Sequence, residues 1–169
     1  MALPFMLYMF ATYIDGVGYV GETEEVKLPK LGRVMESFRA GGMSGAVKID
    51  LGNDEMEAEI KFGGLVKRAL ESYGAPTVDG VQMRWVGSYK SGSSAVAQAV
   101  EVTMRGRFQE VDFGTQKAGE KSEQGSKFPI SYYKLEIDGS TMIEIDMMSG
   151  VTIVNGVDID AQHRANIGT

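Results

Sequence analysis

The strictest pattern in this 169-residue chain is an alternation of apolar and charged residues across positions 54–62. Every second residue there is apolar, namely Met56, Ala58, Ile60 and Phe62, and the intervening positions hold Glu55, Glu57, Glu59 and Lys61. Successive side chains of a β-strand point to opposite faces, so a period of two predicts a strand. We expect its apolar face to pack against a core and its other face to be wet and acidic.

Further strand-like runs follow one another along the chain, separated by turns rich in glycine. The composition agrees with many short strands, because the chain has 22 glycines and only 4 prolines. The first two runs are expected to pair with each other, and the sixth and seventh to form a long hairpin. The predicted strands are 7–14, 19–28, 33–39, 47–51, 54–62, 81–89, 96–111, 130–137, 142–147 and 151–154.

One segment changes period. Apolar residues at 65–73 fall at helical spacing, Gly74 is placed as the C-terminal stop, and Pro76 follows it. Residues 158–166 are expected to form a second, short helix at the end. Helices do not alternate regularly with strands, which argues against a parallel doubly wound sheet. The predicted fold is mainly β, with two packed antiparallel sheets, sandwich-like or barrel-like, one flanking α-helix, and a single domain over 1–169.

The sequence gives little support for catalytic activity or for cofactor binding. Cysteine is absent, which removes thiol nucleophiles and thiolate metal sites, and His163 is the only histidine. Residues 16–21 match the dinucleotide pattern G-x-G-x-x-G, but no helix follows, so we interpret them as a hairpin turn. Asp158 and Asp160 lack the patterned spacing of a calcium loop. We expect no enzyme activity, no cofactor and no metal.

The charge balance also limits possible partners. The net charge is −6 and lysines and arginines form no dense run, which disfavours tight binding to nucleic acid. The apolar stretch at 4–14 has no preceding lysine or arginine and is shorter than the ~20 residues that span a bilayer. A buried strand is therefore expected there, without membrane insertion.

Six strings stand in order along almost the whole chain: Leu-Pro-Lys-Leu at 28–31, Phe-Arg-Ala-Gly-Gly-Met at 38–43, Val-Lys-Ile-Asp-Leu-Gly at 47–52, Val-Thr-Met-Arg-Gly-Arg at 102–107, Tyr-Tyr-Lys-Leu-Glu-Ile-Asp-Gly at 132–139 and Val-Asn-Gly-Val-Asp at 154–158. Jointly they resemble one family, the major tail tube proteins of contractile phages, which R-type bacteriocins share.

The resemblance implies two packed β-sheets flanked by a helix, six copies in a ring, and rings stacked into a hollow tube inside a contractile sheath. Expected partners are further copies of the chain, the tail sheath protein, and the tape-measure, baseplate and terminator proteins. DNA, or ions in a headless bacteriocin, would pass through the lumen without specific binding. The location would be a virion tail or bacteriocin particle, assembled in the host cytoplasm. The alternative is a secreted hexameric ring of a type VI-like system.

Three groups of residues are candidates for assembly. A mobile glycine loop at 41–46 is expected to contact a neighbouring subunit or ring, through Arg39, Gly41, Gly42, Met43 and Gly45, with Met43 exposed; the polar loop at 114–127 is the next candidate. The acidic strand is expected to line the lumen through Glu55, Glu57 and Glu59. The exposed surface of the predicted helix, with Lys67, Arg68 and Glu71, is one possible place for the sheath.

Overall fold

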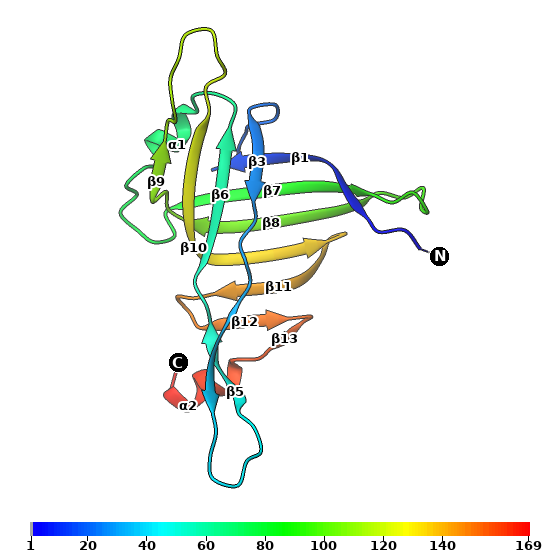
Figure 1. Ribbon diagram of the computed structural model, residues 1–169, viewed down its shortest axis with the longest axis vertical. Helices are drawn as coiled ribbons and strands as arrows, with labels where there is room; N and C mark the ends of the chain where they lie inside the picture. Colours follow the sequence, from blue (N-terminus) through cyan, green and yellow to red (C-terminus); the bar gives the residue numbers. More distant parts are fainter. Residues whose placement is uncertain (1) are drawn as a thin grey trace.

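The fold is organised around one long strand, β10 (Gln124–Ile137), which belongs to two layers (Figure 1). The computed structural model describes residues 2–169. The first half of β10 lies between β6 (Met56–Phe62) and β9 (Glu110–Asp112). Its second half lies between β8 (Gln98–Gly106) and β11 (Ser140–Asp146). The strand therefore links the two layers covalently.

All strand pairs in these layers are antiparallel, so the predicted mainly β fold with two antiparallel sheets is confirmed. In Figure 1 the strands of the smaller layer, β3-β6-β10-β9, run across those of the larger one. The larger layer has the order β13-β12-β11-β10-β8-β7-β1-β2. The other strands of the larger layer are β1 (Met6–Ile14), β2 (Val17–Gly18), β7 (Val81–Lys90), β12 (Val151–Val154) and β13 (Val157–Asp158). In the smaller layer, β3 spans Thr23–Lys27.

The change of layer within β10 depends on a close backbone approach. The pairing of β10 with β8 shifts register between Ile130 and Tyr132. A Cβ atom added to Gly106 would lie 2.0 Å from the carbonyl oxygen of Pro129. Only glycine lets the two strands approach this closely where β10 bends. The bend is thus encoded at the end of β8 as well as in β10.

The core fills the space between the layers. The apolar face of β6 is buried, as its alternation predicts, and its charged face is turned outward. Opposite it lie Met83, Trp85 and Met104 of the larger layer. Val66 and Ala69, around the first helix, add to the same cluster. The core therefore needs apolar residues on only one face of each layer.

A separate two-stranded ribbon, β4 (Arg33–Phe38) and β5 (Val47–Asn53), projects from the body between β3 and β6. Figure 1 shows it extending beyond both layers at the bottom of the view, near the C-terminal helix. The sequence predicts both of its strands but not that they leave the body.

Helix α1 (Lys67–Glu71) is shorter than the predicted 65–73, because Val66 keeps an extended backbone and its N–H donates to the side-chain Oε1 of Gln124 at 3.0 Å. Helix α2 (Ala161–Ile167) confirms the expected short helix at the end of the chain. Among residues 2–169, no helix is long and apolar enough to cross a membrane.

Four local predictions are wrong. The stretch at 4–14 is a buried strand only near its end, because Thr12 and Ile14 of β1 are buried whereas its first four residues, 6–9, are 44–70% exposed. The second predicted strand does not pair with the first: β1 pairs with β2 and β7, whereas β3 pairs with β6. The chain does turn back at Asp15–Gly16, but after β2 a second turn, with positive φ at Gly21 and hydrogen bonds from the Glu22 and Thr23 N–H groups to the Tyr19 carbonyl oxygen, leads it away from β1. The predicted strand 96–111 is split into β8 and β9, and the end of the predicted loop 114–127 is already strand β10. The hairpin-turn interpretation of residues 16–21 is confirmed.

Candidate assembly surfaces

The glycine loop forms the tip of the β4–β5 ribbon. Gly41, Gly42 and Gly45 are exposed, and a Cβ atom at any of them would meet nothing within 4 Å. Met43 is half-buried rather than exposed, because the tip folds back on itself: its Sδ lies 3.2 Å from the Ala40 N–H, and Arg39 Nε donates to its carbonyl oxygen at 3.3 Å. The expected exposure of Met43 is therefore wrong for the free subunit.

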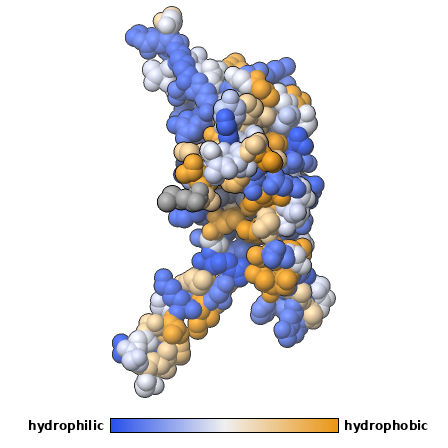
Figure 2. Space-filling view, turned by 90° about the vertical axis from the view of Figure 1, so that its right-hand side faces the viewer, coloured by the Kyte–Doolittle hydropathy of each residue, from blue (hydrophilic) through white to orange (hydrophobic). Residues whose placement is uncertain are grey.

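The two faces of the ribbon differ strongly. Phe38 lies opposite Val47, and Glu36 lies opposite Ile49, so these four share one face. By alternation Val34 and Leu51 belong to it as well. The five apolar residues of this face are 43–61% exposed, and Figure 2 shows the ribbon as a separate projection with apolar side chains along its shaft. An apolar surface on a projecting element is typical of an interaction site.

Polar contacts fix the base of the ribbon to the body. Arg33 Nε donates to Asp50 Oδ2 at 2.8 Å, and Arg33 Nη1 donates to Asn53 Oδ1 at 2.7 Å. Asn53 Nδ2 in turn donates to Thr152 Oγ1 of β12 at 2.8 Å. The hydrogen bond from the Arg33 guanidinium, with a second from the Gly52 N–H, lowers the pKa of Asp50. The ribbon is thus held at its root while its tip is free.

The outward face of the smaller layer carries charges in cross-strand rows. In one row, Lys27, Glu59, Lys127 and Glu110 lie side by side on β3, β6, β10 and β9. In the next row, Glu25, Lys61, Gly125 and Asp112 occupy the same strands. Glu57 is exposed on the same face. Carboxylates outnumber ammonium groups here, but the face is mixed in sign rather than purely acidic.

One predicted lumen residue is already paired. Lys27 Nζ lies 2.9 Å from Glu59 Oε1. This hydrogen bond raises the pKa of Lys27 and lowers the pKa of Glu59, so both groups stay charged over a wide pH range. Both side chains remain largely exposed, which keeps the pair a weak contributor to stability.

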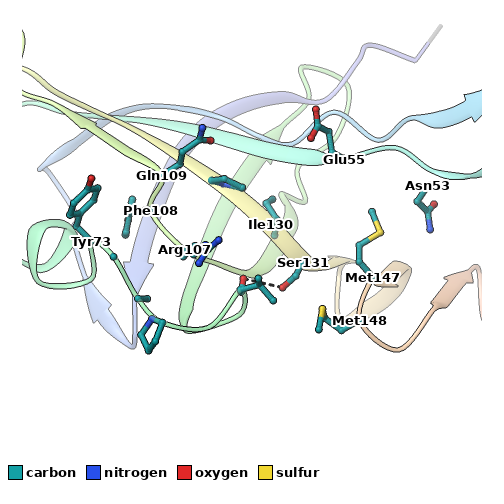
Figure 3. A pocket seen from close by; sticks show the side chains of 15 residues that line it. Asn53, Glu55, Tyr73, Arg107, Phe108, Gln109, Ile130, Ser131, Met147 and Met148 are labelled. Atoms are coloured by element: carbon teal, nitrogen blue, oxygen red, sulfur yellow. Dashed lines mark hydrogen bonds between the residues drawn. The ribbon is translucent and has the colours of Figure 1, made fainter.

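Glu55 lines a surface hollow together with Glu57 and Glu59, and it also borders a second one. It precedes β6 and stands at the rim of a cleft of about 900 Å³ between β10, the segment after α1 and the turn after β11 (Figure 3). Glu55 and Arg107 are the charged groups of its lining, and Ser131 Oγ donates to the Val78 carbonyl oxygen across its floor at 3.3 Å. The structure therefore brings all three of these glutamates to one surface, with Glu55 at its edge.

The predicted sheath-facing residues lie on α1. Lys67 is 87% exposed and pairs with Glu71 one helical turn later, at 3.3 Å. Arg68 points to the body instead, with Nη2 2.9 Å from Asp15 Oδ2. Hydrogen bonding to Asp15 raises the pKa of Arg68. Lys67 and Glu71 are available to a partner, whereas Arg68 anchors the helix to the β1–β2 turn.

The polar loop before β10 projects at the opposite end from the ribbon, at the top of Figure 1. Its Lys121 Nζ lies 2.5 Å from Glu24 Oε2 at the start of β3 and 3.2 Å from Glu123 Oε1. The loop is therefore tied across the end of β6 instead of hanging free.

Two surfaces escape sequence reasoning. One is the apolar face of the ribbon, although the alternation of Val47, Ile49 and Leu51 with Lys48 and Asp50 was a usable signal. The other is the identity of the free sheet edges: open edges are expected of an antiparallel sheet, but the sequence does not show that they are β3 and β9 of the smaller layer, which no other strand of residues 2–169 covers. Free edges depend on the pairing order, which a pattern within one strand does not contain.

Known proteins resemble this chain along its whole length. The family described as phage tail tube protein FII matches residues 4–168. The tail tube protein of Escherichia phage P2 is 40% identical over 171 residues, which cover 99% of each chain. The major tail tube protein of Serratia phage KSP20 is 37% identical, over 88% of this chain and 86% of its own.

The fold is likewise found in solved tubes. A chain of the extended sheath–tube complex of an extracellular contractile injection system superposes with a TM-score of 0.59 at 10% identity, over 79% of this chain and 91% of the other. A chain of the sheath/tube terminator of the same kind of system gives 0.58, covering 79% and 96%. Full-length matches to curated tail tube proteins settle the relationship: the chain belongs to the phage tail tube protein FII family and has the structural role of a tube subunit in a contractile tail.

Proposed function

We propose that residues 1–169 act as one domain that forms closed rings of six copies, and that these rings stack into the hollow inner tube of a contractile tail. The observation that carries this proposal is the apolar face of the β4–β5 ribbon, whose five apolar residues are 43–61% exposed. Such a face on a projecting arm fits a heterologous contact, in which one copy binds a different surface of the next. Contacts that close by rotation give rings, and axial repeats give a tube.

The free edges of the smaller layer supply the closure. Edge strands expose unpaired backbone groups that bind other strands. Strands β3 and β9 are the two outer members of this four-strand layer, and an even number of antiparallel strands makes them run in opposite directions. The β9 edge of one copy therefore meets the β3 edge of the next in antiparallel orientation.

In such a ring the charged face of the smaller layer lines the lumen, with Glu57 and Glu59 among its acidic groups and Glu55 near the end of the strand. Excess carboxylates on the wall repel DNA phosphates, so that a genome slides through without binding. The ribbon tip, with Arg39 and the loop 41–46, contacts the next ring. Lys67 and Glu71 of α1 are offered to the sheath, with tape-measure, baseplate and terminator proteins at the tube ends. The tube does no chemistry and assembles in the host cytoplasm.

Electron microscopy of the purified protein tests the assembly. Long tubes are expected. Isolated rings that never stack would favour the alternative, a secreted ring of a type VI-like system, and monomers at high concentration would refute both.

Charge reversal tests the lumen. Glu57→Lys is the sharper variant, because among residues 2–169 no lysine or arginine pairs with Glu57. Particles built with this variant should form normal tubes but deliver DNA more slowly. The same reversal at exposed Asp79, outside this layer, is the matched control. Equal delivery by the two variants would argue against a lumen position for Glu57.

A further inference from the structure

On the outward face of the smaller layer, the β3 edge carries a lysine beside Glu25, whereas both charges of the β9 edge are acidic. Lys27 is exposed on β3, and Glu110 and Asp112 are exposed on β9, all on the outward face. Among residues 2–169, neither Glu110 nor Asp112 has a lysine or arginine within ion-pair distance. Charged residues on an edge usually keep other strands away. A lysine on one edge and two carboxylates on the other have the reverse effect in an alignment that keeps Glu25 away from those carboxylates, since the lysine then attracts a second copy.

We propose that Lys27 of one subunit binds the Glu110 and Asp112 carboxylates of the next, and that this contact sets the register in which the two edges join. The occupant of each edge is thus a second copy of this chain. The inference rests on the proposed ring closure through β3 and β9. It adds the residues that determine the register between these two strands.

Register can be argued from the charges alone. Residues directly opposite each other in a ladder share a face, so only shifts of two residues keep Lys27 beside an outward residue of β9. With Lys27 opposite Glu110, Glu25 meets Asp112, a like-charge pair. With Lys27 opposite Asp112, Glu25 meets Gly114 and no like charges face each other. A shift the other way places Glu25 against Glu110 and leaves Lys27 without a carboxylate directly opposite.

The alignment with Asp112 opposite Lys27 therefore has the best charge balance. It staggers the joined strands by two residues relative to the rows within the subunit, and strands must stagger when a sheet closes into a barrel. Lys27 already contacts Glu59 at 2.9 Å, but an ammonium group has three N–H donors and can bind a second carboxylate. The row Lys27–Glu59–Lys127 would then continue into the next subunit with alternating sign.

Disulfide trapping tests the contact directly, because the chain has no cysteine of its own. Lys27→Cys is combined with Asp112→Cys or with Glu110→Cys. Within one subunit these positions are three strand spacings apart, roughly 14 Å, which is too far for a disulfide. Any bond formed on oxidation therefore joins two subunits. The control is Lys61→Cys with Asp112→Cys, because Lys61 lies on the inner strand β6.

Oxidised tubes of the Lys27 pairs should run as a ladder of linked subunits on a denaturing gel, stronger with Asp112 than with Glu110, and the control should run as monomer. Tubes that are visible by microscopy but give no ladder with either cysteine pair would overturn the proposed contact of Lys27 with Glu110 and Asp112, while leaving ring stacking intact. Absence of tubes in wild-type protein would instead count against the proposed function.

A second variant needs no thiol and covers the case in which the cysteine chains do not assemble. Glu110→Gln with Asp112→Asn keeps the shape of both side chains and removes their charge. It should raise the subunit concentration needed for tube formation several-fold at low salt, with little effect at high salt, where screening already weakens the contact. If the double variant and the control variant Glu57→Gln need the same subunit concentration to form tubes, the proposed contact is refuted.

Discussion

Asn53 at the end of the ribbon donates a hydrogen bond of 2.8 Å to the hydroxyl of Thr152 in β12, 99 residues further along the chain. Thr152 is buried, and Asn53 also accepts from Arg33. The contact joins the ribbon, which lies early in the sequence, to the last strands of the body. It fixes the direction in which the ribbon leaves the subunit.

Replacing this hydroxyl should loosen the ribbon. Thr152→Val keeps the shape but leaves the Asn53 amide without its acceptor, which should cost about 1–2 kcal/mol of unfolding free energy. Amide hydrogen exchange should become faster in β4 and β5 and stay unchanged in β7 and β8. Thr103→Val on the outer face of β8 is the matched control. Uniform exchange changes across the chain would refute a local anchoring role.

The bend of β10 predicts a large effect at one glycine. Gly106→Ala should destabilise the fold by about 3 kcal/mol or more, since the added Cβ meets the Pro129 carbonyl oxygen at 2.0 Å and both partners are backbone. Gly125→Ala, on the same long strand, meets nothing within 4 Å and should be neutral or gain about 0.5 kcal/mol. Denaturant unfolding of the two variants measures the difference. Equal midpoints would contradict the close approach.

The C-terminal helix should be sensitive to acid. Arg164 pairs with Asp158 through Nη2 and also donates to the Gly150 carbonyl oxygen at 2.9 Å. The hydrogen bond from Arg164 lowers the pKa of Asp158 below its usual 3.8. A carboxyl with a lowered folded-state pKa stabilises the fold above the unfolded value and loses that contribution as pH falls through the folded one.

We therefore expect the protection of α2 to decline below about pH 4 in the wild type. Asp158→Asn should lower that protection at neutral pH and remove most of its decline in acid. Amide hydrogen exchange of the α2 backbone, measured from pH 7 to pH 3, checks both effects. An unchanged acid profile in Asp158→Asn would mean that another carboxyl controls this region.

Features that follow from the residues of a single strand could be predicted from the sequence, whereas features that depend on which strands are neighbours could not. Burial of every second residue in β6 was predictable, because it follows from alternation within one strand. The partner of β3 was not, because its core contact with Ile60 arises only once the chain has crossed to the other layer. The charge of the outward face was misjudged for the same reason: Glu59 is acidic in its own strand, but Lys27 and Lys127 lie on either side of it.

The apolar ribbon face carries the clearest prediction for assembly. Ile49 is 46% exposed, so Ile49→Lys should change the unfolding free energy by less than about 0.5 kcal/mol. In a tube, however, the same side chain would be buried against another copy, where an unpaired ammonium group is costly. We expect folded subunits that form no tubes. Lys48→Ser, on the opposite face of the same strand, is the matched control and should assemble normally. Electron microscopy and sedimentation of both variants measure the outcome; tubes from Ile49→Lys would show that this face stays exposed after assembly.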